Sequence, residues 1–307
     1  MLEKIENRYF QLYSSIDIYD VPLVFIVGSP RTGSTLLYQL MINFFNFYYF
    51  TNFVNNNFYM YPIVGTVIQE PLRKYKRAVE YESYYGKTKG LFGPSEASFI
   101  FRRWYGGEHP SQLYSSKVLP YAKEHMVNTF KSIYGLTYKA VLTKNAWNCF
   151  RIENLSNIFP NIHYVWIRRD IRDAAFSDLE ARYKRGSPYH WNSATTANYK
   201  EIQKLPYWEQ VVEQQYWFNV HIEKELNIRS SYQIWYEDIC SDKLEDKLHD
   251  LYVWLKDLLS IDLDCKVFKI KAPKFTPSTR LKRDDDYSRI EKYVKNNLDR
   301  MERFTYE

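Results

Sequence analysis

One short segment, residues 24–35 with the sequence VFIVGSPRTGST, constrains the fold more than any other part of the chain. An apolar, β-rich run ends at Gly28, and the residues from Ser34 onward read as a helix. Gly28 and Gly33 permit a tight turn between the two elements. The backbone N–H groups of such a turn, together with the N-terminus of the following helix, attract anions. The pattern predicts a phosphate-binding loop between a buried strand and a helix.

Strand and helix patterns alternate along the rest of the chain. The expected strands are residues 21–27, 138–144, 163–168 and 232–237. The expected helices are residues 34–45, 120–134, 151–159, 172–184, 206–227, 241–259 and 284–301. Apolar strands that alternate with helices predict an α/β fold of three layers, in which helices cover both faces of a central parallel sheet. Because no repeat or linker divides the chain, we expect residues 1–307 to form a single domain.

Ligands of such sheets bind beyond the carboxyl ends of the strands. The chemistry is therefore expected after Val27, Thr143 and Ile167.

Composition narrows the class of protein. Hydrophobic residues make up 45% of the chain, which is ample for a buried core. The net charge of +6 is compatible with an anionic ligand and too small to demand nucleic acid. Cys149, Cys240 and Cys265 offer no CxxC pair and no zinc spacing, so we expect reduced thiols in a cytoplasmic protein. The apolar stretch 36–50 contains polar residues and is shorter than the roughly 20 residues of a membrane span, so none is expected.

The cation of the phosphate loop is displaced from its usual place. The phosphate-binding loop of a nucleoside triphosphatase reads GxxxxGK[ST], in which lysine reaches the β- and γ-phosphates and a hydroxyl holds magnesium. In GSPRTGST, Ser34 replaces that lysine and Arg31 lies in the middle of the loop. This departure disfavours an ordinary kinase or GTPase. The expected ligand contacts of the loop are Arg31, Thr32, Gly33, Ser34 and Thr35.

A second basic segment follows the third expected strand, in HYVWIRRDIRDAAFSDL at residues 163–179. Arg169 supplies a forked donor at the strand end, and Ser177 lies two turns into the next helix. A solvated basic turn remains an alternative for these arginines. Asp170 could be read as the metal-holding acid of a triphosphatase, but two arginines directly before it would repel magnesium.

Together the two segments resemble the sulfotransferases that use 3′-phosphoadenosine 5′-phosphosulfate (PAPS). The loop is similar to the arginine version of the family's 5′-phosphosulfate loop, found in tyrosylprotein and many bacterial members. Arg169 and Ser177 have the eight-residue spacing of the family's arginine and serine that hold the 3′-phosphate. The family often has proline where Ile171 stands. The resemblance implies transfer of a sulfuryl group from PAPS to a hydroxyl or amine of a carbohydrate, lipid or small metabolite, without a metal. The many tyrosines and phenylalanines indicate an AT-rich coding sequence, which favours a bacterial source.

Two further segments carry weaker expectations from the same resemblance. The stretch FTPSTRLKRDDD, residues 275–286, resembles the loop that closes over the cofactor, which implies phosphate contacts from Ser278 and Arg280. A solvated charge run is the alternative there. The segment WYEDI, residues 235–239, resembles a YEDL segment of these enzymes, and we interpret it as structural, a strand end and helix start.

Sulfuryl transfer needs a base for the acceptor and cations near the departing phosphate. Arg31 and Lys144 are the expected cations, and Lys144 resembles the lysine that tyrosylprotein sulfotransferases present from an equivalent strand. Glu96 in GLFGPSEASF, beside a turn and apolar residues, is the preferred base and resembles a GPxE stretch of bacterial sulfotransferases. Capping of the following helix is the alternative role for Glu96.

Two other residues compete with Glu96 for the role of base, namely Glu70 and His109. The tyrosylprotein enzymes carry their glutamate nearer the phosphate loop, where this chain has asparagines such as Asn52 and Asn55. A nucleoside or nucleotide kinase with an altered loop and a non-catalytic nucleotide-binding protein remain alternative functions.

Overall fold

The computed structural model describes residues 1–73, 79–81, 83–84, 87–107, 116–259, 263, 273–276 and 285–306. The expected contacts Ser278 and Arg280 and the alternative base His109 lie outside the described residues. The start of the last expected helix, Asp284, also lies outside them.

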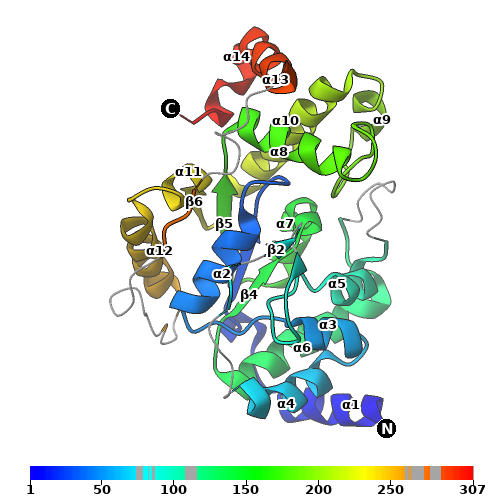
Figure 1. Ribbon diagram of the computed structural model, residues 1–307. Coiled ribbons are helices and arrows are strands. Elements are labelled where there is room, and N and C mark those ends of the chain that lie inside the picture. Colours follow the sequence, from blue (N-terminus) through cyan, green and yellow to red (C-terminus); the bar gives the residue numbers. More distant parts are fainter. Residues whose placement is uncertain are drawn as a thin grey trace.

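A sheet of four parallel strands forms the centre of the molecule (Figure 1). The strand order is β4-β1-β5-β6. The bounds are β1 (Leu23–Val27), β4 (Val141–Lys144), β5 (Ile162–Arg168) and β6 (Ser231–Trp235). Each expected strand is confirmed, with ends displaced by a few residues. The prediction did not include a short antiparallel pair, β2 (Ser83–Tyr84) and β3 (Lys87–Thr88).

The side chains of β1 alternate between two cores, as successive residues of a strand must. Leu23, Phe25 and Val27 pack into one core, and Val24 and Ile26 into the other. The first core is covered by α6 (Lys123–Thr137), α7 (Ile152–Ile158), α8 (Ile171–Tyr183) and α10 (Tyr207–Leu226). The second core is covered by α2 (Ser34–Phe44) and α12 (Leu244–Leu258). The three-layer α/β fold is confirmed.

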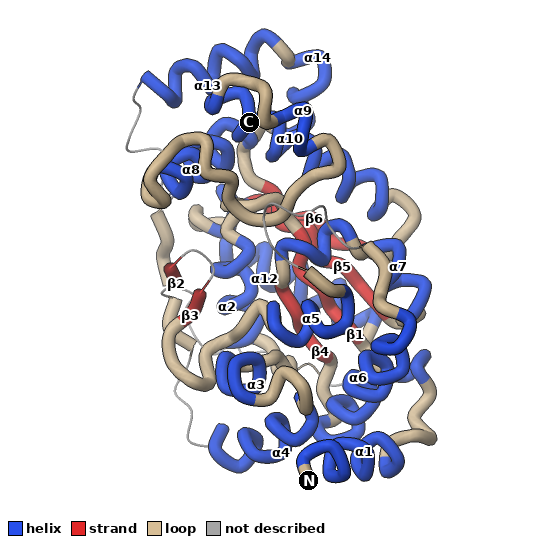
Figure 2. The backbone as a smooth tube through the Cα atoms, turned by 90° about the vertical axis from the view of Figure 1, so that its right-hand side faces the viewer, coloured by secondary structure: helices blue, strands red, loops and turns tan. Residues whose placement is uncertain are grey.

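The remaining helices lie at the two ends of the sheet (Figures 1 and 2). At the end near the N-terminus are α1 (Leu2–Leu12), α3 (Asn52–Asn57) and α4 (Pro62–Arg73). The exception is α5 (Ser98–Tyr105), which lies over the face of the sheet in Figure 2, where the Phe101 ring contacts Phe25 of β1. At the other end are α9 (Tyr199–Ile202), α11 (Tyr236–Ile239), α13 (Asp285–Asn296) and α14 (Leu298–Met301). The last expected helix is therefore two helices, which meet at Asn297.

Local details depart from the sequence pattern at two places. Residues 120–122 form a separate 3-10 turn before α6, where one continuous helix was expected. Pro71 lies inside α4, although proline in a helix interior usually kinks or breaks the helix. Because proline has no backbone N–H, the carbonyl of Val67, four residues earlier, receives no helical hydrogen bond from it. No helix in the described part of the chain is both long and apolar enough to cross a membrane.

Candidate active site

The loop between β1 and α2 has two residues in the left-handed conformation, Arg31 with φ 69° and Gly33 with φ 84°. A Cβ atom at Gly28 would lie 2.7 Å from the carbonyl oxygen of Ile167, so glycine allows β1 and β5 to approach at the loop. The buried Thr32 hydroxyl donates to the carbonyl of Ser29, 2.8 Å away, and fixes the turn. The loop is thereby held with the N-terminus of α2 directly behind it.

The two segments that the sequence singled out are in direct contact. Arg169 follows β5, and its Nη1 donates to the carbonyl oxygen of Arg31 at 2.8 Å. The Nε of Arg31 donates to Oγ of Ser177 in α8 at 3.2 Å. Both Arg169 and Ser177 are buried. The loop cation and the Arg169/Ser177 pair therefore form one cationic site, not two separate ones.

The neighbouring arginines have structural partners. The guanidinium of Arg168 lies over the ring of Trp235, 4.3 Å from its centroid. Arg172 forms an ion pair with Asp170. The Asp170 carboxylate also accepts the backbone N–H groups of Arg172 and Tyr306, so it caps α8. Asp170 is therefore a helix cap, and this role replaces the metal-ligand role considered from the sequence. A solvated basic turn does not describe Arg169, which is 4% exposed.

Tyr236 and Glu237 complete this part of the site, and the sequence interpretation missed their role. The WYEDI segment is a strand end and helix start, as expected, because β6 ends at Trp235 and α11 begins at Tyr236. The Tyr236 ring lies against Gly33 and under Arg169, whose guanidinium is 4.4 Å from the ring centroid. In the sequence, only the resemblance of WYEDI to a YEDL segment pointed to Tyr236 and Glu237. That resemblance did not indicate which residues they would contact.

Glu237 is a buried carboxylate beside the same arginine. Its Oε1 accepts the backbone N–H of Asp170 at 3.0 Å. Burial raises the pKa of Glu237 to about 7, against the opposing effects of that hydrogen bond and of the Arg169 charge. The carboxylate thus holds the turn from which Arg169 projects.

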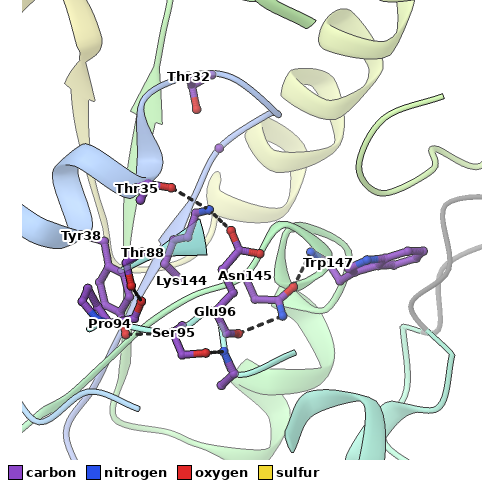
Figure 3. A network of polar contacts seen from close by, with 12 residues as sticks. Thr32, Thr35, Tyr38, Thr88, Pro94, Ser95, Glu96, Lys144, Asn145 and Trp147 are labelled. Atoms are coloured by element: carbon purple, nitrogen blue, oxygen red, sulfur yellow. Dashed lines mark hydrogen bonds and ion pairs between the residues drawn. The ribbon is translucent and has the colours of Figure 1, made fainter. Parts of the chain in front are cut away.

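Lys144 and Glu96 form an ion pair beside the loop (Figure 3). Lys144 is the last residue of β4, and the register places it opposite Ile26 of β1. Its Nζ also donates to Oγ1 of Thr35 in the first turn of α2, at 3.3 Å. The side chain of Glu96 is 29% exposed, against 9% for Lys144. One cation therefore connects the phosphate loop to a carboxylate that solvent can reach.

The local backbone explains how Glu96 is held. Nδ2 of Asn145, the residue after Lys144, donates to the carbonyl oxygen of Glu96 at 3.0 Å. The next residue, Ala97, has a left-handed conformation with φ 53°, which is costly for alanine and turns the chain into α5. The capping role considered for Glu96 is wrong, because Ala97 is the N-cap and Asn55 accepts the N–H of Phe99. Glu70 lies within α4, whereas Glu96 is paired at the loop.

A cavity of about 810 Å³ opens beside Glu96. Its described lining comes from α3, from residues 88–96 and from the first turn of α5: Asn52, Asn55, Asn56, Thr88, Gly90, Leu91, Pro94, Ser95, Glu96, Ser98 and Phe99. Trp104 and Tyr105 of the neighbouring α5 do not line this cavity and are buried in the core. Trp191 packs under the guanidinium of Arg182.

These features define a class: parallel α/β proteins with a glycine-bearing, anion-attracting loop after the first strand and a second cationic segment packed against it. Residues 22–256 match the model of the sulfotransferase family. The chain belongs to that family, whose members are transferases that move sulfuryl groups.

Solved structures with the same fold are also sulfotransferases. One from Mycobacterium avium aligns with a TM-score of 0.56 at 14% identity, covering 96% of this chain and 80% of that one. One from Mycobacterium tuberculosis aligns with a TM-score of 0.56 at 14% identity, covering 97% and 81%. At this identity the likeness concerns the fold. A comparison with curated proteins gives no match.

Proposed function

We propose that this chain transfers the sulfuryl group of PAPS to a hydroxyl or amine of a small-molecule or glycan acceptor. The observation that carries the proposal is the contact between the phosphate loop and the Arg169/Ser177 segment. A ligand with an anionic group at each end of its ribose needs two such elements side by side. PAPS, when bound, supplies the activated sulfuryl group, and 3′-phosphoadenosine 5′-phosphate is the product that leaves.

The residues present fit such a ligand. The loop residues Thr32 to Thr35, with the N-terminus of α2, would hold the 5′ end, where a Cβ at Gly33 would fill space next to Tyr236. Arg169 and Ser177 would hold the 3′-phosphate through charge-assisted hydrogen bonds. Arg31 is the cation of the loop. Its side chain donates to Ser177, and its carbonyl oxygen accepts from Arg169. Among the described residues, no group of three or more His, Cys, Asp or Glu side chains could hold a metal ion.

We assign the base role to Glu96. Its carboxylate lines the cavity, is partly exposed, and would accept the proton of the acceptor hydroxyl. Lys144 forms the ion pair with this carboxylate and reaches Thr35 of the loop with the same ammonium group. Lys144 and Arg31 would then stabilise the negative charge that develops on the departing phosphate oxygen. In this arrangement the base faces the acceptor cavity, Lys144 connects the base to the loop, and Arg31 belongs to the loop itself.

We infer that residues 1–307 form one catalytic domain, because Val21 and Phe304, which are far apart in the sequence, belong to the same hydrophobic core. Cys149 is a buried thiol outside any disulfide, in keeping with a cytoplasmic location.

Calorimetry with 3′-phosphoadenosine 5′-phosphate, adenosine 5′-monophosphate and ATP with magnesium tests the donor site. We expect metal-free binding of the bisphosphate that is tighter than binding of either other nucleotide. Tight binding of ATP with magnesium alone would favour a kinase with an altered loop. Bisphosphate binding without transfer or slow PAPS hydrolysis would favour a non-catalytic nucleotide-binding protein.

Replacement of Arg31 by alanine tests the catalytic role of the loop cation. Removal of one group that stabilises transition-state charge costs about 10²–10³ in kcat, measured as release of 3′-phosphoadenosine 5′-phosphate from PAPS. Lys292, a solvent-facing residue of α13 that belongs to neither the loop nor the Arg169/Ser177 pair, gives a matched control when changed to alanine. Near-normal transfer by the Arg31→Ala variant would contradict the mechanism.

A further inference from the structure

The described wall of the cavity beside Glu96 carries no charged side chain other than Glu96 itself. Among the described residues that line it, Glu96 is the one ionisable group, and Lys144 already pairs with it. The rest of the described lining consists of amides, hydroxyls and apolar groups. An anionic acceptor would lose its hydration here without meeting a cation in the wall, which is costly for a charged group. The cavity therefore favours a neutral acceptor.

The polar wall is rigid because its members bond to each other. Nδ2 of Asn52 donates to the carbonyls of Thr88 and Gly90, at 3.0 and 2.9 Å. Asn55 accepts the N–H of Phe99 through Oδ1 and donates through Nδ2 to Oδ1 of Asn56, at 3.0 and 2.9 Å. These bonds fix the wall before any acceptor arrives, so its remaining groups have set positions.

Several hydrogen-bonding groups of this wall are not used by described neighbours, and two of them can donate to an acceptor. Within the described part of the chain, Asn56 Nδ2 and Ser98 Oγ take part in no hydrogen bond. Asn56 lies on α3, and Ser98 begins α5 two residues after Glu96. Both can donate to hydroxyl oxygens, and Ser98 can also accept.

Phe99 adds an apolar surface to the same wall. It is 42% exposed and is the residue after Ser98. Its ring is tilted against the ring of Tyr59, with centroids 5.8 Å apart, and the guanidinium of Arg102 lies 5.7 Å from its centroid, so part of the ring stays open to the cavity. The arginines of α5, Arg102 and Arg103, line a separate cavity of about 710 Å³ together with Phe99. Phe99 thus separates the uncharged cavity from a cationic one.

We propose that the acceptor is a neutral pyranoside. Its ring lies with the apolar C–H face on Phe99, two of its hydroxyls bond to Asn56 and Ser98, and a third faces the Glu96 carboxylate. This combination of an apolar face and a few fixed polar groups is how small-molecule sites set orientation. The inference rests on the proposed function and adds the class and charge of the acceptor to it.

The test uses matched pairs of methyl glycosides. Methyl β-D-glucopyranoside, galactopyranoside and mannopyranoside are each compared with the methyl uronide that carries a carboxylate at C6. With PAPS as donor, sulfated product is measured by mass spectrometry and nucleotide release by chromatography. We expect kcat/KM for at least one neutral glycoside to exceed that for its uronide by about tenfold or more, which corresponds to about 1.4 kcal/mol.

A charge added to the wall should reverse this preference. Asn56→Lys places a cation in the cavity and should raise the uronide-to-neutral ratio of kcat/KM about tenfold. Asn57→Lys is the matched control, because Asn57 is the next residue of α3, is exposed, and is not part of the described lining. It adds the same charge and should leave the ratio unchanged. Phe99→Ala should raise KM for the neutral glycoside severalfold without changing the affinity for the bisphosphate.

The outcomes separate the two proposals. If the bisphosphate binds and PAPS is hydrolysed or used with 4-nitrophenol, but no neutral glycoside of the panel is sulfated, the acceptor inference is overturned and the proposed function stands. Equal use of uronides and neutral glycosides, or equal effects of Asn56→Lys and Asn57→Lys, also overturns the inference. Failure to bind the bisphosphate overturns both.

Discussion

Gly33 offers a sharp test of how the phosphate loop and Tyr236 fit together. Its φ of 84° is in the left-handed region, and a Cβ atom there would overlap Cδ2 of Tyr236 and lie 2.8 Å from Cε2. Gly33→Ala should therefore cost free energy in two ways. The backbone strain of a left-handed alanine is about 1–2 kcal/mol, and overpacking against a ring costs about 1–3 kcal/mol more. We expect the free energy of unfolding to fall by about 2–5 kcal/mol in total.

Gly90 provides a matched control for the strain. Its φ is 81°, almost the same, but no described atom lies within 4 Å of where its Cβ would be. Gly90→Ala should cost about 1–2 kcal/mol, the strain alone. The difference between the two variants isolates the clash with Tyr236. Urea denaturation followed by tryptophan fluorescence measures both.

The clash should also affect ligand binding, because the ring that must move is the ring under Arg169. Loss of this cation–π contact costs about 1 kcal/mol, or about fivefold in Kd for 3′-phosphoadenosine 5′-phosphate. In a Tyr236→Ala background, Gly33→Ala should cost no more than Gly90→Ala does. If the two glycine variants lose equal stability in the wild-type background, or if Gly33→Ala binds the bisphosphate normally, the reasoning is refuted.

Three other predictions concern charge. Glu96→Gln should lower kcat about 10²–10⁴-fold with unchanged bisphosphate affinity, and turnover near the wild-type rate would exclude Glu96 as the base. Glu6, buried in α1, accepts two N–H groups at the start of α4, and burial raises its pKa to about 7 from 4.5. The folded state keeps this proton between those values, so the free energy of unfolding falls as pH rises from about 4.5 to 7, by up to about 3 kcal/mol. Glu6→Gln should remove that part of the pH dependence in denaturation at pH 5 and 8; an unchanged slope would contradict the assignment. Asp178→Asn leaves the fully buried Arg182 without its counter-charge and should cost about 3–5 kcal/mol. Glu225→Gln breaks a more exposed pair four residues apart and should cost less than about 1 kcal/mol in the same assay; equal losses would show that burial does not decide the cost.

Patterns within short stretches of sequence predicted the four central strands and the longer helices beside them, but not α1, α3, α4, α5 and α9. The apolar run before Gly28 and the helix after Ser34 follow from residue type and periodicity, which act over a few neighbours, and the structure has both. Lys144 and Glu96 were both selected from their local settings, a strand end and a turn. That their charged groups pair with each other could not be read from either setting.

The acceptor cavity was not predictable for a related reason. Asn52 and Asn55 were noted only as a departure from the tyrosylprotein pattern, and Asn56 was not singled out. Trp104 of the neighbouring α5 is in the core and does not line the cavity. Whether a tryptophan is buried or lines a cavity depends on which helices pack over it. The periodicity of its own segment does not indicate which helices these are.

The sequence by itself determined the strand–loop–helix unit, the position of its arginine and the spacing of Arg169 and Ser177, because these depend on contacts between near neighbours in the chain. Only the tertiary structure decided the strand order and the contacts of Arg31 with Arg169 and Ser177. It also decided the packing of the Tyr236 ring against Gly33. These depend on pairings between distant segments, and a strand can hydrogen-bond to any other exposed strand edge, so its own residues do not name its partner.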